Sequence, residues 1–138
     1  MKSIKKAKAI LTIGAVSGFV SVSMGAFAAH ALKSKLSLEM FANFKTATQY
    51  QMWHTIVLLI IGLLLLFVKS KKLAWSSIFF ILGIILFSGS LMTYSITLIK
   101  FFAMVTPFGG LSFLVGWILF FLSIKEILLQ THNLRDKL

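Results

Sequence analysis

The residues of this sequence best suited to chemistry are eight polar side chains set in or beside long apolar stretches: His30, Gln49, Tyr50, Gln51, His54, Ser88, Ser90 and Thr106. Tyr50 and His54 are four residues apart, so on a helix they share one face. A histidine side chain titrates near neutral pH, and His54 could therefore carry a proton. Together these residues suggest a hydrogen-bonded polar cluster inside a membrane.

Signatures of catalysis and of metal binding are absent from the sequence. It has no cysteine, which excludes disulfides, thiolate metal sites and thiol catalysis. Ser88-Gly89-Ser90 lies in the middle of a predicted helix, without the strand–turn–helix elbow of a hydrolase. A metal site built from His30, Glu39 and His54 is conceivable, but no ligand spacing favours it. The three acids provide no pair of carboxylates for acid–base work, so we expect no enzyme, metal or cofactor: Glu39, Glu126 and Asp136.

Four apolar runs must position the polar residues: 9–32, 46–68, 73–99 and 103–124. About 20 apolar residues in a helix span the hydrocarbon core of a bilayer, so each run is long enough to cross. The chain has 138 residues, of which 59% are hydrophobic and 12% charged, too few charges for the surface of a soluble domain. We therefore predict an all-α integral membrane four-helix bundle that forms a single domain, 1–138.

Basic residues flank the four runs unevenly, and the asymmetry predicts orientation. One side holds four, which are Lys33, Lys35, Lys45 and Lys100. The positive-inside rule places the side with more basic residues, which carries both termini, in the cytoplasm. The net charge of +11 predicts contact with anionic lipid headgroups rather than with nucleic acid. The other side holds ten: Lys2, Lys5, Lys6, Lys8, Lys69, Lys71, Lys72, Lys125, Arg135 and Lys137.

The first run also has a feature of secretory signals. Ala26-Phe27-Ala28 resembles a signal-peptidase site. The apolar stretch from Ala9 to Ala29 is longer than the roughly 7–15 residues of a cleavable signal. We therefore expect the first helix to be retained.

Small residues predict where helices pack closely: Gly14, Gly18, Ser21, Gly25, Gly89, Gly109, Gly110 and Gly116. In the first run, Ser17, Ser21, Gly25 and Ala29 recur every four residues. Small side chains at this spacing let helix backbones approach each other in lipid. This pattern favours packing within the bundle, and a dimerisation face is the alternative.

Two connections carry local signals. The segment Ser34–Lys45 mixes apolar and charged residues and would suit a short helix lying in the membrane interface. Thr106 before Pro107 is typical of a helix start, with threonine as N-cap and proline in the first helical position.

Helix geometry predicts that the polar residues meet at one depth. His54 is nine residues from Lys45 and Ser90 is ten from Lys100, so both lie about 14–15 Å along their helices from that side. Polar groups near mid-membrane pair with one another or line a cavity. The cluster therefore provides hydrogen bonds between helices or, alternatively, lines an outward-facing pocket.

Four segments of the chain resemble a known family. The YgdD/YwdK-type small bacterial inner-membrane proteins, a family of unknown function (DUF423) with eukaryotic relatives, share these motifs, although Ala28 and Met92 depart from the common pattern. The resemblance implies a four-span protein of the bacterial inner membrane that retains its N-terminus, and it implies no activity. The matching segments are Gly25–Leu32, Thr46–His54, Leu86–Leu91 and Thr106–Gly110 continuing to Gly116-Trp117.

These observations favour a structural or accessory membrane protein that acts by helix packing, as a homo-oligomer or with another membrane protein. The alternative is binding or transport of a small molecule, ion or proton through the outward-facing polar pocket. An enzyme is the least favoured class because the sequence offers no acid–base pair.

Overall fold

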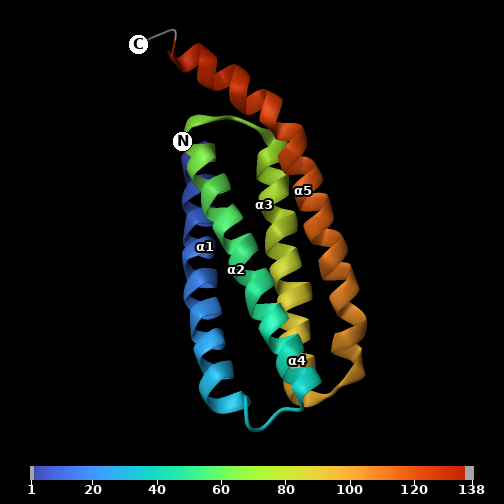
Figure 1. Cartoon of the computed structure of the whole chain (residues 1–138). Coiled ribbons are helices and arrows are strands. Elements are labelled where there is room, and N and C mark those ends of the chain that lie inside the picture. The colour runs from blue at the N-terminus through green and yellow to red at the C-terminus, as the bar shows by residue number, and fades with distance from the viewer. Residues whose placement is uncertain (1, 136–138) are drawn as a thin grey trace.

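The computed structural model describes residues 2–135 and is helical along almost all of this length (Figure 1). Asp136 and Lys137, used above in counting charges, lie outside the described residues. Four helical rods are long and apolar enough to cross a membrane, over Ile4–Leu32, Leu38–Phe67, Lys71–Thr97 and Lys100–His132. The elements are α1 (Lys2–Phe27), η1 (Ala28–Leu32), α2 (Leu38–Phe67), α3 (Lys71–Gly83), η2 (Ile84–Gly89), α4 (Ser90–Thr97) and α5 (Lys100–Arg135).

Two of the four rods contain a π-helical segment. In the first rod, η1 continues α1, and in the third, η2 joins α3 to α4. A π turn closes its hydrogen bonds over five residues instead of four, and such turns are frequent at functional sites. The η1 segment lies within the matching segment Gly25–Leu32, and η2 overlaps the matching segment Leu86–Leu91.

The connection between the first two rods differs from its prediction. No separate interfacial helix occurs at 34–45, because α2 is one continuous helix from Leu38 onward. Ser37 explains this start, since its side-chain oxygen accepts a hydrogen bond from the backbone N–H of Met40 at 3.2 Å. The charged residues at 38–45 thus form the first turns of a spanning helix.

The start of the fourth rod also differs from its prediction. Helix α5 begins at Lys100, so Thr106 is not an N-cap and Pro107 lies inside the helix. The reason is the short turn before it, where Leu98 adopts a left-handed conformation (φ 59°) and ends α4. The Thr106 hydroxyl instead donates to the carbonyl of Phe102 at 3.0 Å, as threonines inside helices often do.

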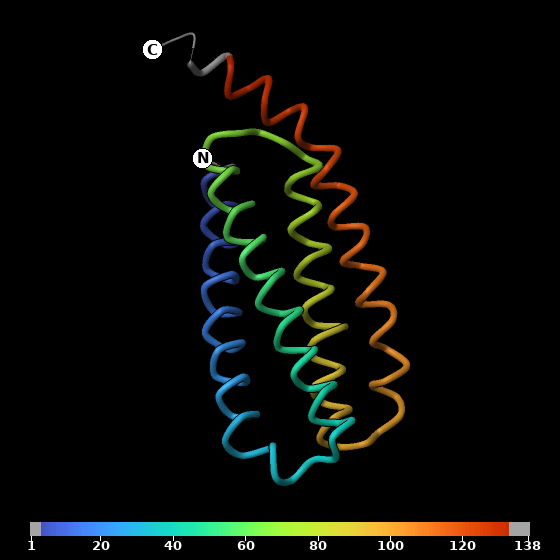
Figure 2. Tube along the Cα trace, viewed as in Figure 1, coloured from blue at the N-terminus to red at the C-terminus, as the bar shows by residue number. Residues whose placement is uncertain are grey.

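The rods form two closely packed pairs. Helix α1 packs along α2, and α3 packs along α5, while α2 also contacts η2 and α4 and so joins the pairs (Figure 2). The main apolar core lies between α2, α3 and α5 and includes Leu58, Ile61, Phe80 and Phe113. A smaller core of Ala28, Leu32 and Phe44 holds η1 against the start of α2.

One end of the molecule is fastened by polar contacts. Gln130 on α5 accepts a hydrogen bond from the Lys69 backbone N–H (2.8 Å) and donates to the Lys69 carbonyl (3.0 Å). Glu126 forms an ion pair with Lys72 at 2.8 Å and accepts a hydrogen bond from Ser70. These contacts hold the α2–α3 connection against α5, which extends beyond the other rods at this end (Figure 1).

Candidate functional site

His54 is the central residue of the candidate site, and both of its ring nitrogens have partners. Nδ1 lies 2.7 Å from the carbonyl of Tyr50, which can only accept, so Nδ1 carries the proton. Nε2 lies 3.3 Å from the indole Nε1 of Trp117, which can only donate, so Nε2 accepts. This pattern assigns a neutral imidazole with one defined tautomer.

Aromatic rings surround His54. Its ring stacks on Phe113 with centroids 3.6 Å apart and planes within 8°. Phe80 and Trp117 lie at its other sides with centroids 5.5 and 6.2 Å away, and Tyr50 lies at 6.0 Å. Only 5% of the His54 surface is exposed. The imidazole is therefore packed as a core residue between the two helix pairs.

Gln51 belongs to a different polar group, at the interface between α1 and α2. Its amide nitrogen donates to the carbonyl of Ser17 at 3.2 Å, and the Ser17 hydroxyl bonds with that of Thr55 at 2.6 Å. One turn further, the Ser21 hydroxyl donates to the carbonyl of Thr48 at 3.0 Å. We call this group the serine seam, defined by Ser17, Ser21, Thr48, Gln51 and Thr55.

Ser90 and Thr106 form a third polar group, between α4 and α5. Their hydroxyl oxygens lie 2.8 Å apart, and that of Ser90 also donates to the carbonyl of Leu86. Ser88 does not join them. Its hydroxyl is buried, with 1% of the residue exposed, and has no hydrogen-bond partner within the described part of the chain.

His30 and Gln49 lie apart from all three groups. Both are exposed, His30 in η1 and Gln49 on α2. Gln49 borders a cavity of about 330 Å³ between η1 and α2, which includes none of the other seven predicted cluster residues. Of the eight predicted residues, the structure brings Tyr50 to His54 and Ser90 to Thr106, and it places the others elsewhere rather than in one common cluster. Within residues 2–135, His, Asp and Glu side chains form no group able to hold a metal.

The predicted packing residues fall into two classes. At Gly14 and Gly116, an added Cβ would lie 2.8 Å from the Leu59 side chain and 2.9 Å from the Phe80 ring, so these side chains would have to shift to admit it. At Gly109 the Cβ would collide with the backbone of Phe87. Gly18 and Gly110 leave ordinary contact distances of 3.5 and 3.8 Å.

Gly25 and Gly89 do not serve helix packing, contrary to expectation. A Cβ on Gly25 would meet nothing within 4 Å, because the glycine borders the cavity beside η1. A Cβ on Gly89 would meet only the carbonyl of Ile84, at 3.9 Å, in its own helical rod. Spacing along one helix shows where small residues align, but not which face meets a neighbour.

Several important residues were missed. Trp117, which is 44% exposed, is the hydrogen-bond partner of His54, and the signal that could have found it is its indole N–H, a donor placed among apolar residues. Gly83 was missed too, although a Cβ there would strike the ring of Phe113. Ser76 and Ser112 donate across the α3–α5 interface, to the carbonyls of Gly116 and Phe79, both at 2.7 Å.

Comparison with known proteins places the chain in a family. Residues 24–110 match the model of a family described as a protein of unknown function, DUF423. The chain belongs to the DUF423 family. The match covers η1, α2, η2 and the close approach at Gly109, whereas Ser17 and Trp117 lie outside it.

Named relatives support the same assignment. The UPF0382 inner membrane protein YgdD of Escherichia coli K12 is 39% identical over 110 residues, covering 80% of this chain and 84% of the relative. The UPF0382 membrane protein SAB0533 of Staphylococcus aureus RF122 is also 39% identical, over 81% of this chain and 91% of the relative. No solved structure matches the chain. The chain is therefore a DUF423-family membrane protein with four candidate spans.

Proposed function

We propose that this family member is a non-catalytic structural or accessory protein of the bacterial inner membrane, which acts by packing against a second copy or another membrane protein. The observation that carries this proposal is the state of His54. Its two nitrogens are occupied by Tyr50 and Trp117, and its ring is stacked on Phe113. Hydrogen bonds between both ring nitrogens and groups within the bundle support a packing role for this histidine.

The other polar groups support the same function. Gln51 and Thr55 are used in hydrogen bonds to α1, and Ser90 is used in its bond to Thr106. In a membrane, such bonds associate helices without the help of water. The competing function, transport through an outward-facing pocket, would need these groups to line one shared cavity.

We further propose that both termini lie in the cytoplasm. The start of α1 and the α2–α3 connection lie at the same end of the molecule (Figure 1), and both segments are rich in lysine. The opposite end has Lys33, Lys35, Lys45 and Lys100. The positive-inside rule then orients the first end toward the cytoplasm.

Accessibility to a thiol reagent tests both proposals, because the chain lacks cysteine. Single cysteines would be placed at Ser88 and Ser90, then treated from outside intact cells with a membrane-impermeant maleimide. We expect protection at both positions and labelling after denaturation in detergent. Rapid labelling of either position in the folded protein would contradict the packing function and indicate a hydrated pocket.

Two exposed positions serve as controls for orientation. We expect labelling from outside at Ser37→Cys and protection at Lys69→Cys, since these residues lie in connections at opposite ends of the rods. Ser70 is unsuitable because it is buried and caps α3. The reverse labelling pattern would overturn the proposed orientation.

A further inference from the structure

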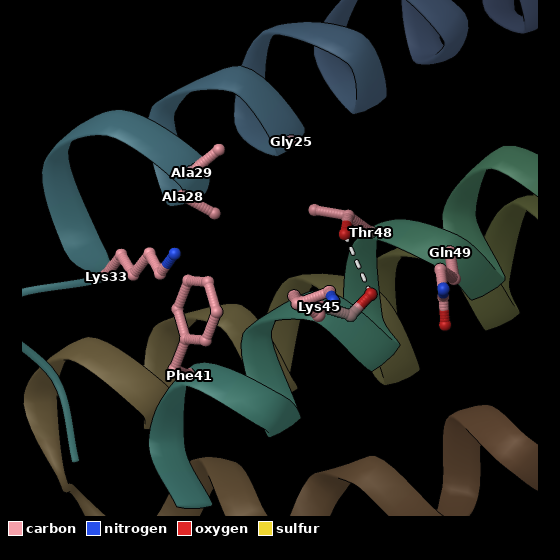
Figure 3. A pocket seen from close by; sticks show the side chains of 8 residues that line it. All are labelled: Gly25, Ala28, Ala29, Lys33, Phe41, Lys45, Thr48 and Gln49. Atoms are coloured by element: carbon pink, nitrogen blue, oxygen red, sulfur yellow. Dashed lines mark hydrogen bonds between the residues drawn. The ribbon is translucent and has the colours of Figure 1, made fainter. Parts of the chain in front are cut away.

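The cavity between η1 and α2 has features that the proposed function does not use. It has a volume of about 330 Å³, within the roughly 300–1,000 Å³ typical of ligand pockets. Figure 3 shows its walls, with η1 on one side and the first turns of α2 on the other. Lys33, at the end of η1, and Lys45, on α2, extend on either side of Phe41.

The two lysines that line this cavity, Lys33 and Lys45, form no ion pair with an acidic side chain of the described residues. Glu39 is near in sequence but does not line the cavity. Two ammonium groups beside one cavity repel each other and favour an anion between them.

The walls leave room for that anion. Gly25 faces open space, since an added Cβ would meet nothing within 4 Å. Ala28 and Ala29 extend this small-residue wall. In the final hydrogen bond of the π turn, the Lys33 N–H donates to the Ala28 carbonyl at 3.1 Å. Lys33 therefore directly follows the turn that contains Ala28 and Ala29. The π turn thus brings the positively charged Lys33 to the cavity wall that Gly25 leaves open.

The position of the cavity indicates where the anion comes from. Lys33 directly follows a spanning rod and Lys45 lies in the early turns of the next, so the cavity is at the membrane surface. Lipid phosphates occupy this level, and lysine side chains near the membrane surface attract anionic headgroups. The apolar ring of Phe41 and the exposed Val22, one turn below Gly25, would contact the rest of a lipid.

We propose that this cavity binds the phosphate of an anionic phospholipid, in the leaflet at the end of the molecule opposite the termini. The phosphodiester lies between the ammonium groups of Lys33 and Lys45, above the wall formed by Gly25 and Ala29. The lipid acts as a third component that joins the end of the first rod to the start of the second.

The test is native mass spectrometry of the purified protein titrated with phosphatidylglycerol or with zwitterionic phosphatidylcholine. We expect a saturable phosphatidylglycerol adduct, weakened about fivefold by Lys33→Gln or Lys45→Gln and about thirtyfold by the double variant. Lys35→Gln is the matched control, because Lys35 is an exposed lysine in the same connection that does not line the cavity. Its affinity should stay within about twofold of the unchanged protein.

A second variant tests the space rather than the charge. Gly25→Leu fills the cavity, and its Cβ has no neighbour to displace, so the helical circular dichroism should be retained while the adduct is lost. Equal binding of the two lipids, or equal losses in Lys35→Gln and Lys33→Gln, would overturn the proposal. Displacement of the lipid by inorganic phosphate at similar concentration would also overturn it, by showing a site for the free anion.

Discussion

The two helix pairs of this protein are held together in different ways. Between α1 and α2, the serine seam combines the 2.6 Å contact of the Ser17 and Thr55 hydroxyls with bonds from Gln51 and Ser21 to backbone carbonyls. Between the third rod and α5, aromatic rings occupy the space left by glycines, as where Phe80 meets Gly116. Here the serines donate to backbone carbonyls, as Ser112 does to Phe79.

The difference shows two solutions to one physical problem. Helices in lipid gain little from hydrophobic burial, so hydrogen bonds and close packing must hold them together. The serine seam depends on hydrogen bonds that single substitutions weaken slightly. The glycine contacts depend on shape, and even one added methyl group has no space where the neighbour is backbone. The second pair should therefore be the less tolerant of added volume.

The largest expected effect is that of Gly109→Ala. Its methyl group would collide with the backbone of Phe87 in η2, which cannot move aside as a side chain can. We expect a loss of about 3 kcal/mol in the free energy of unfolding, the upper part of the usual range for overpacking. Unfolding by sodium dodecyl sulfate in mixed micelles, followed by circular dichroism, would measure it.

The neighbouring glycine provides the control. Gly110→Ala has the same helix propensity change, but its Cβ would lie at an ordinary 3.8 Å from Phe87. We expect it to be neutral or to stabilise by up to about 1 kcal/mol. Equal effects of the two substitutions would contradict the close approach of α5 to η2.

An intermediate effect is expected in the serine seam. Ser17→Ala removes the hydroxyl that bonds with Thr55 and Gln51, and should cost about 1 kcal/mol of unfolding free energy. A double-mutant cycle with Thr55→Val should give a coupling energy of about 0.6 kcal/mol. Ser23→Ala, at a half-buried position of the same helix, should change stability by less than about 0.5 kcal/mol. A coupling energy of zero would show that Ser17 and Thr55 contact each other without a stabilising hydrogen bond.

The smallest loss of stability is expected at Ser88. Its buried hydroxyl has no partner in the described structure, so Ser88→Ala should be neutral or stabilise by about 1 kcal/mol. Ser90→Ala, which loses the bond to Thr106, should cost about 0.6 kcal/mol under the same unfolding conditions. If Ser88→Ala is the more damaging of the two, the third rod relies on a polar contact at Ser88 rather than on shape.

Sequence patterns predicted some parts of the site better than others. The apolar runs and the family follow from local composition and motifs, and both the four helices long and apolar enough to span a membrane and the family membership are confirmed. Depth was the basis for grouping Ser90 with His54, but equal depth does not give equal direction around the helix axis. Ser90 instead bonds with Thr106, and the partner of His54 is Trp117.

The predictions of the fourth helix start and of the packing role of Gly25 were wrong for a related reason. Pro107 was interpreted from local preference, yet the left-handed Leu98 allows the helix to start at Lys100. Gly25 belongs to a regular stripe of small residues, yet it borders the cavity between η1 and α2, where an added Cβ would meet nothing within 4 Å. Local signals cannot include neighbours that are distant in the sequence.

The sequence by itself determined that this is a membrane protein of four long helices, because hydrophobic length and charge placement act on each segment separately. Only the tertiary structure decided which polar residues meet. Side-chain direction depends on helix rotation and on the π turns at η1 and η2, which shift every residue after them. Lys33, which donates the last hydrogen bond of η1, lies beside the cavity, and Phe87 within η2 lies against Gly109; neither position could be found from spacing alone.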